Sequence, residues 1–212
     1  MNNRKIILLK AAVWLASLGP FLWLALLGWN SFHGKMPNLG ANPIEFITLT
    51  TGNSTLVFLM ITLGITPLRR ITSWNWLIRF RRLTGLFAFF YGCLHLMTFV
   101  WLDQEFDWNN MVKDVVKRPF ITMGMLAFAL MVPLAVTSTA WSIRKMGGKN
   151  WYSLHRLIYI SAICGVIHFW WKVKADISEP LLYGIVLAGL LLFRIFWAGK
   201  EWMKKRKSSS AA

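Results

Sequence analysis

The twenty residues LTGLFAFFYGCLHLMTFVWL, at positions 83–102, decide the fold class of this chain. They contain no Asp, Glu, Lys or Arg, although Arg81 and Arg82 precede them and Asp103 follows. A helix of about twenty apolar residues spans the roughly 30 Å hydrocarbon core of a bilayer. The stretch therefore predicts a transmembrane helix that carries a histidine, His95, within it.

Five further apolar blocks accompany this one in a chain of 212 residues, of which 56% are hydrophobic. Counted together, the six blocks lie at 6–30, 53–68, 83–102, 119–138, 152–172 and 180–199. The block at 53–68 is the weakest, because its apolar core is short and contains threonine. Residues 44–51 must extend it, or the helix there is thinned or broken. The pattern predicts an all-α membrane protein, a bundle of six transmembrane helices.

The charged residues between the blocks alternate in sign from one side of the membrane to the other. One side carries sixteen Lys and Arg residues against one acid, Glu201, and the other carries six against seven acids. Because Lys and Arg are enriched in cytoplasmic loops, both termini are expected in the cytoplasm. The same bias explains the net charge of +16. The positive charge is then expected to face anionic lipid headgroups, and nucleic acid is not needed as a partner to explain it.

The loops leave no room for a second folded domain. We expect one six-helix transmembrane domain at 1–203, followed by a basic, flexible cytoplasmic tail at 204–212. With no readable substrate pocket, any substrate chemistry is expected on a separate protein.

Three of the four histidines lie inside the predicted helices, where an ionisable side chain is costly and usually functional. From the helical rise, His95 lies about 18 Å and His168 about 24 Å from the cytoplasmic ends of their helices. Both therefore fall in the periplasmic half. Two imidazoles at matched depth on facing helices are typical of axial heme ligation. The alternative is that each histidine packs and hydrogen-bonds without a metal.

His155 lies thirteen residues before His168, about 20 Å toward the cytoplasm along an ideal helix. Their angular offset on such a helix is about 220°, so the two do not share a face. A second heme at His155 would need a distorted helix or a different partner helix. Arg156 beside it could pair a heme propionate or a flavin phosphate, or simply reach toward the interface.

The remaining candidate ligands have simpler explanations. Thiolate ligation by Cys93 or Cys164 is conceivable, but small core residues are more typical of cysteines in apolar segments. His33 follows the first block and fits a solvated loop residue. A proton relay would need buried carboxylates, and the predicted helices supply none.

Several strings, in this order and spacing, resemble a known family. They are Ile65-Thr66-Pro67-Leu68-Arg69-Arg70, Arg81-Arg82-Leu83-Thr84-Gly85-Leu86 with Leu94-His95, Lys117-Arg118-Pro119-Phe120-Ile121-Thr122, and Trp151 to Tyr159 leading to His168-Phe169-Trp170. Together they resemble the MsrQ family, the heme-binding membrane subunits of bacterial protein-methionine-sulfoxide reductase systems.

The resemblance implies a cytochrome of the ferric-reductase-like transmembrane type in the bacterial inner membrane, with heme b and FMN as cofactors. It implies His95, His155 and His168 as ligands, and it assigns no residues to FMN. The domain at 1–203 would then be heme-binding, and the chain would be an electron-transfer subunit that is not itself catalytic. Electrons would pass from the quinone pool, or from a cytoplasmic flavin reductase, to a periplasmic molybdenum-cofactor methionine sulfoxide reductase. The alternatives are a ferric reductase or NADPH-oxidase-like cytochrome fed by a separate flavin reductase, and a small transporter that carries out no redox chemistry.

Overall fold

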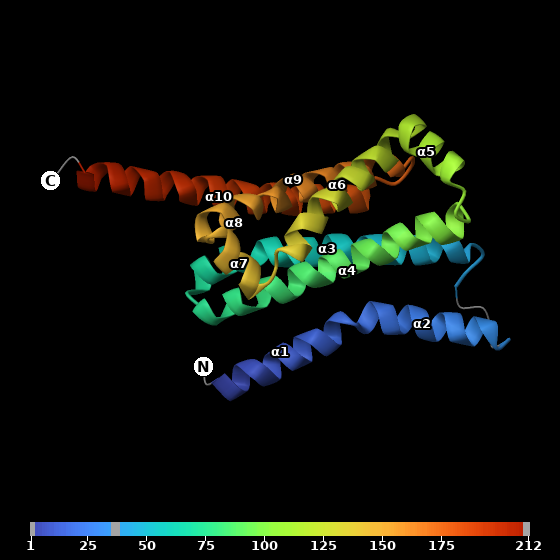
Figure 1. Ribbon diagram of the computed structural model, residues 1–212, viewed down its shortest axis with the longest axis horizontal. Coiled ribbons are helices and arrows are strands. Elements are labelled where there is room, and N and C mark those ends of the chain that lie inside the picture. The colour runs from blue at the N-terminus through green and yellow to red at the C-terminus, as the bar shows by residue number, and fades with distance from the viewer. Residues whose placement is uncertain (1–2, 35–38, 210–212) are drawn as a thin grey trace.

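The protein, analysed as a computed structural model that describes residues 3–34 and 39–209, is a bundle of long helices (Figure 1). Within those ranges, six helical segments are long and apolar enough to cross a membrane. They are Arg4–Phe32, Pro43–Thr72, Asn75–Asp103, Pro119–Val136, Gly148–Lys172 and Ser178–Lys204. The described ends of the chain lie at the same end of the bundle (Figure 1). The predicted six-helix membrane fold is confirmed.

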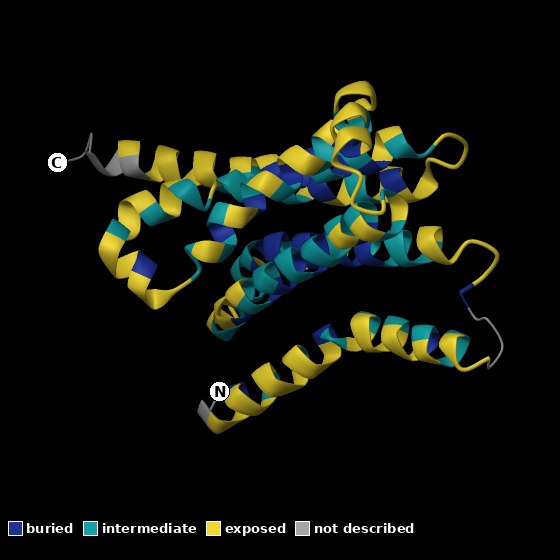
Figure 2. Cartoon of the chain, turned by 45° about the vertical axis from the view of Figure 1, so that its right-hand side comes forward, coloured by how far each residue is buried: buried dark blue, intermediate teal, exposed yellow. Residues whose placement is uncertain are grey.

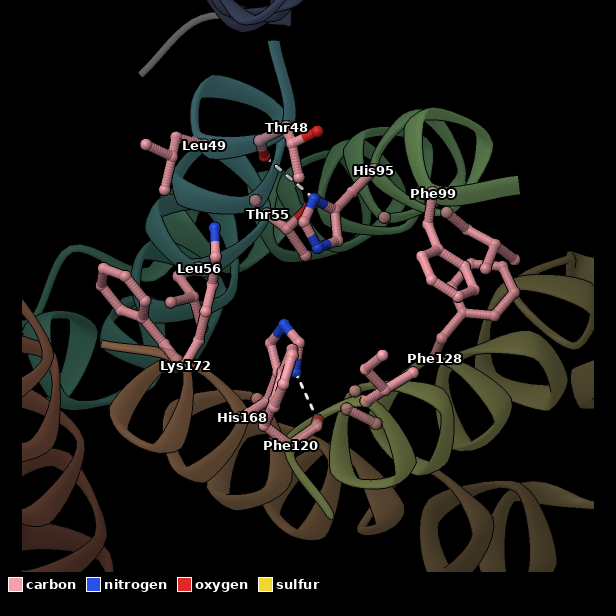
Figure 3. A pocket seen from close by; sticks show the side chains of 18 of the residues that line it. Thr48, Leu49, Thr55, Leu56, His95, Phe99, Phe120, Phe128, His168 and Lys172 are labelled. Carbon is pink, nitrogen blue, oxygen red and sulfur yellow. Dashed lines mark hydrogen bonds between the residues drawn. The ribbon is translucent and has the colours of Figure 1, made fainter. Parts of the chain in front are cut away.

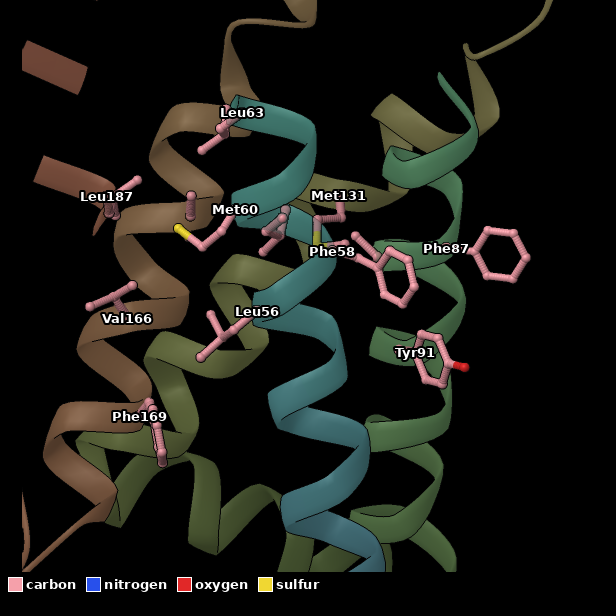
Figure 4. Packing of buried hydrophobic residues seen from close by; sticks show 13 residues of the cluster. Leu56, Phe58, Met60, Leu63, Phe87, Tyr91, Met131, Val166, Phe169 and Leu187 are labelled. Atoms are coloured by element: carbon pink, nitrogen blue, oxygen red, sulfur yellow. The ribbon is translucent and has the colours of Figure 1, made fainter. Parts of the chain in front are cut away.

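Four helices form the centre of the bundle: α3 (Pro43–Thr72), α4 (Arg81–Met97), α6 (Pro119–Val136) and α9 (Leu157–Lys172). Helix α3 packs mainly on α4, and α6 packs mainly on α9. The buried side chains between them include Leu59, Leu63, Ala88 and Ala162, and Figure 4 shows part of this core. Short elements complete the two ends of the bundle: η1 (Asn75–Phe80), η2 (Thr98–Asp103), α5 (Trp108–Lys117), α7 (Ala140–Met146) and α8 (Gly148–Leu154).

Buried hydroxyl groups join the helices within each pair. Thr62 of α3 donates to the Thr84 hydroxyl of α4 at 2.8 Å. Ser161 of α9 donates to the Ala127 carbonyl of α6, also at 2.8 Å. Small polar residues of this kind allow close helix approach and supply interhelical hydrogen bonds where lipid offers none.

The weak second block forms one continuous helix, so the expected alternative of a broken helix is wrong. Helix α3 begins at Pro43, and the side chain of Asn42 caps it by accepting from the Glu45 N–H at 3.2 Å. A proline in the first turn costs no hydrogen bond, because the first N–H groups of a helix have no intrahelical acceptor. Residues 44–51 thereby supply the length that the 53–68 block lacks.

The first block bends in its middle, between α1 (Asn3–Ser17) and α2 (Gly19–Phe32). The hydroxyl of Tyr91 lies at the break: it donates to the Ser17 carbonyl at 2.6 Å and accepts from the Phe21 N–H at 3.3 Å. In a straight helix these two backbone groups would bond to each other. Tyr91 is fully buried. An inserted hydroxyl beside Pro20 is a recognised cause of a helix kink.

Helices α1 and α2 lie along one side of the bundle, and most of their residues are exposed (Figure 2). The buried residues gather instead on the central helices. In a membrane protein, an exposed apolar surface of this kind faces lipid. The two hydrogen bonds of the Tyr91 hydroxyl, to Ser17 and Phe21, attach this helix pair to α4.

Helix α10 (Ser178–Ser209) carries an arginine inside its apolar segment that the loop-by-loop count of charges omits. The Arg194 guanidinium donates to the Leu63 carbonyl at 2.7 Å and to the Tyr159 hydroxyl at 2.9 Å. Leu63 needs this donor because its usual partner four residues on is Pro67, which has no N–H. Arg194 thus joins α10 to α3 and α9. The helix continues to Ser209, past the expected boundary at residue 204.

The fifth block is not one unbroken helix. The angular offset of about 220° between His155 and His168, which assumes a continuous helix, is therefore wrong. Helix α8 ends at Leu154, and His155 and Arg156 form a turn before α9 begins at Leu157. The His155 N–H bonds to the Trp151 carbonyl at 3.0 Å and closes α8. His155 therefore lies at a helix junction, and the angular argument from a continuous helix does not apply to it.

Candidate functional site

A cavity of about 560 Å³ lies between the four central helices (Figure 3). Its inner end is apolar, with Leu59 of α3 and Met131 of α6 in its lining. Its other end is formed where α3 and α6 begin and where η2 and α9 finish, and the residues there are charged: Glu45, Asp103, Arg118 and Lys172. A volume of this size suits a small molecule or cofactor.

His95 enters the cavity from α4 and lies against α3. Its Nδ1 atom is 3.0 Å from the Thr48 carbonyl oxygen. Because a carbonyl only accepts, Nδ1 carries the proton and donates it. Gly52 makes this approach possible, since a Cβ atom there would lie 3.0 Å from His95 Cε1.

His168 enters from α9 and lies against α6 in the same way. Its Nδ1 donates to the Phe120 carbonyl at 2.6 Å. A Cβ atom at Gly124 would lie 2.7 Å from Nδ1, closer than real Cβ atoms come. In both helices the accepting carbonyl belongs to the residue four positions before the glycine. The two histidines are therefore held by one repeated arrangement, in which a missing side chain lets an imidazole reach the helix backbone.

The two imidazoles face each other across the cavity, with ring centroids 6.0 Å apart and planes at 77° (Figure 3). The prediction that His95 and His168 come together is confirmed. With Nδ1 protonated, each neutral ring has its lone pair on Nε2. Two imidazole nitrogens bound to one metal ion at about 2 Å each place their ring centroids about 6 Å apart, so the pair fits a shared metal. Metal-ligating histidines also usually donate their other ring N–H to a carbonyl or carboxylate.

The side chains around His95 and His168 indicate which kind of metal group the pair could bind. Across the described ranges, no three or more His, Cys, Asp and Glu side chains gather as a metal site. A metal at the pair would therefore draw its remaining ligands from outside the protein side chains. A porphyrin supplies four such ligands and leaves two axial positions for histidine, so the residues present fit a heme.

The charged residues of the cavity mouth were not expected from the sequence. Lys172 ends both the predicted block at 152–172 and helix α9, and its half-buried side chain lines the cavity. Arg118 is paired with Asp114 at 3.4 Å. The spacing of Lys172 four residues after His168 could have indicated a shared helix face.

His155 lies outside the residues that line the cavity, at the opposite end of α9 from Lys172. Its Nε2 atom is 3.0 Å from the Thr137 hydroxyl oxygen, and its ring stacks on Trp151 with centroids 3.9 Å apart. Thr137 donates its own hydroxyl proton to the Pro133 carbonyl at 2.6 Å. The hydroxyl oxygen therefore accepts from His155, and Nε2 of that ring carries the proton. Ligation by His155 stays a prediction.

The other candidates take no part in the cavity. Cys164 is buried and Cys93 half-buried, both are free thiols, and neither lines the cavity. His33 is exposed, and its Nδ1 is 2.9 Å from the Trp29 carbonyl. Arg156 is exposed in the α8–α9 turn.

Comparison with known proteins gives consistent results. The family described as "Ferric reductase like transmembrane component" matches residues 48–166, more than half of the chain. A protein of Herminiimonas arsenicoxydans is 53% identical over 207 residues, which cover 97% of this chain and 91% of that protein. A protein of Bordetella pertussis is 47% identical over 208 residues, covering 97% and 96%. One of Ralstonia nicotianae is 47% identical over 204 residues, covering 95% and 90%.

All three relatives carry the name "Protein-methionine-sulfoxide reductase heme-binding subunit MsrQ". The similarity runs along nearly the whole chain and includes the helices that form the cavity. The chain therefore belongs to the MsrQ family, within the ferric-reductase-like transmembrane proteins.

Proposed function

We propose that this chain is a b-type cytochrome of the bacterial inner membrane that passes electrons to a methionine sulfoxide reductase. In this proposal heme b is held between His95 and His168. The observation that carries it is the pair itself: two imidazoles from different helices, 6.0 Å apart, each with Nδ1 bound to a backbone carbonyl and Nε2 left for a ligand. The names of the relatives, which state heme binding, support it.

The residues of the chain prepare the site in two ways. The Thr48 and Phe120 carbonyls fix the orientation of the two rings, so neither has to be ordered when the cofactor enters. Apolar residues at the inner end, such as Leu59, exclude water. When bound, heme supplies reversible one-electron chemistry at the iron, and the axial ligands tune its potential.

The path of electrons is proposed from the charge pattern. The cavity opens at the end of the bundle whose loops are rich in acids, which the positive-inside rule assigns to the periplasm. His155 lies at the other end and would serve a second heme or the entry of electrons from the quinone pool or from a cytoplasmic flavin reductase. FMN belongs to the same proposal, through the family likeness alone, and no residues are assigned to it.

The acceptor in this proposal is a separate periplasmic protein, a molybdenum-cofactor methionine sulfoxide reductase. The segments at 39–42, 104–118 and 173–177 are too short to build a catalytic site for a protein substrate. The chain would then be the electron-transfer subunit and its partner the catalytic one. Docking should be weak and transient, as electron-transfer encounters usually are.

The test is reoxidation of the reduced heme. Heme in membranes that contain the protein is reduced with a quinol, and the purified reductase is added on the periplasmic face together with a methionine-oxidised protein. We expect reoxidation only when both are present. The same rate with and without them would disprove the assignment of the acceptor, and the absence of a heme absorption band in the purified protein would disprove the cytochrome.

The orientation has its own test. Reporter fusions at Met111 and Asp176 should report the periplasm, and fusions at Trp74, Lys149 and Ser209 should report the cytoplasm. A cytoplasmic reporter at Met111 would reverse the direction of electron flow that we propose.

A further inference from the structure

Lys172 occupies a position in the cavity that the proposed function has not yet used. It is one helical turn after His168, and its side chain extends from α9 toward α3 (Figure 3). It lines the cavity at the charged mouth, with the ammonium group at the end of a half-buried side chain.

Among the described residues, this ammonium group has no ion-pair partner. Lys172 takes part in neither the Arg70–Glu201 nor the Arg118–Asp114 ion pair, and within residues 3–34 and 39–209 no carboxylate oxygen lies within 4.0 Å of its ammonium nitrogen. Glu45 and Asp103 interact with Lys172 electrostatically, but from beyond that distance. The other cation of the mouth, Arg118, already has its carboxylate. A cation that is partly removed from water is costly unless an anion pairs with it directly. Neither Glu45 nor Asp103 lies within ion-pair distance, so the position of Lys172 favours an anion on the ligand.

The shape of the cavity indicates how such a ligand would lie. The inner end is apolar, with Leu59 and Met131, and the charged residues are confined to the mouth. An amphipathic ligand would therefore place its apolar body inside and its acidic groups beside Lys172. Heme has this form, with an apolar macrocycle and two propionate carboxylates on one edge.

We propose that Lys172 binds a propionate carboxylate of the heme and so determines which edge of the macrocycle faces the mouth. The inference rests on the proposed function, because it requires a heme between His95 and His168. It makes Lys172 a positioning residue, one that holds the cofactor through its carboxylate while the histidines hold the iron.

The experiment compares heme b with its dimethyl ester, which has the same macrocycle but no carboxylates. The full-length protein is loaded with either compound in nanodiscs of neutral lipid, and the rate of loss to an excess of a heme-binding acceptor protein is measured. A charge-assisted hydrogen bond is worth about 1.5–3 kcal/mol. We therefore expect wild type to lose the ester at least about tenfold faster than heme b.

Three variants complete the design. Lys172→Gln should lose heme b and the ester at similar rates, and Lys172→Arg should keep the preference. Lys174→Gln is the matched control, because Lys174 is exposed and does not line the cavity. It should behave as wild type. In Lys172→Gln the heme midpoint potential should also become more negative, since the loss of a nearby cation stabilises the ferric form.

Equal rates for heme b and its ester in wild type would overturn the inference, and this measurement needs no variant to fold. So would a preference that survives in Lys172→Gln. A third outcome would be that heme b and its ester are lost at equal rates, and that both rates change when anionic lipid is added. This would overturn the inference and indicate that Lys172 binds a lipid headgroup phosphate. A wild-type protein that binds no low-spin heme would instead remove the proposed function, so the two failures are distinguishable.

Discussion

The histidine pair and His155 differ in what their ring nitrogens do. In His95 and His168, Nδ1 donates to a backbone carbonyl and Nε2 faces a cavity. In His155, Nε2 donates to a side-chain hydroxyl, and the ring face is covered by Trp151. The pair thus presents free lone pairs in a space large enough for a ligand, whereas His155 uses Nε2 to hold a helix junction.

The difference shows what preorganises a metal ligand in a membrane helix. All three histidines are at least partly buried, so burial alone does not separate them. Of these three, His95 and His168 each have a glycine beneath the ring and a backbone carbonyl that selects the tautomer, and His155 has neither.

The largest effect should follow removal of a ring. His95→Ala and His168→Ala should each abolish the same low-spin heme component, and the double variant should resemble either single one, because each loses an axial ligand of one iron. His155→Ala should leave that component in place. Optical and electron paramagnetic resonance spectra of the purified proteins measure this. If the two single variants lost different components, the shared iron would be wrong.

An intermediate effect should follow when the space under each ring is filled. In Gly124→Ala the new Cβ atom would lie 2.7 Å from Nδ1 of His168, and in Gly52→Ala 3.0 Å from Cε1 of His95. Overpacking of this kind costs about 1–3 kcal/mol, which corresponds to roughly 5- to 140-fold weaker heme binding, with Gly124→Ala the more severe. Heme titration of the apoprotein measures it.

Gly189→Ala is the matched control for these two variants. Gly189 lies in α10, where an added Cβ atom would meet nothing within 4 Å, and alanine favours helix formation over glycine. This variant should bind heme as wild type does. Equal binding by Gly124→Ala would contradict the role given to the glycines.

The sequence predicts the larger part of this architecture for a physical reason. The hydropathy of each block depends only on the residues within that block, so the six helices can be predicted without knowing any contact between distant segments. The matched depth of His95 and His168 follows equally from the rise of a helix. The facing geometry then needed only that α4 and α9 lie across one cavity from each other.

The rest depends on contacts between distant segments. The roles of Gly52 and Gly124 require knowing which helix each imidazole meets, which periodicity does not reveal. The α8–α9 turn at His155 has no proline to mark it. Arg194 carried a signal that was missed, because an arginine within a transmembrane segment almost always has a partner inside the bundle.

The smallest effect should appear at His155, where Thr137→Val removes the hydroxyl that accepts from Nε2 and keeps the shape of the side chain. Polar contacts between membrane helices average about 0.6 kcal/mol, so the thermal unfolding midpoint in detergent should fall slightly. The spectrum of the heme at the pair should stay unchanged. Thr137→Ser keeps the hydroxyl and is the control. An unchanged midpoint together with a gained or lost second heme component would mean that Nε2 of His155 is bound to iron instead of Thr137, and the contrast between His155 and the pair would then fail.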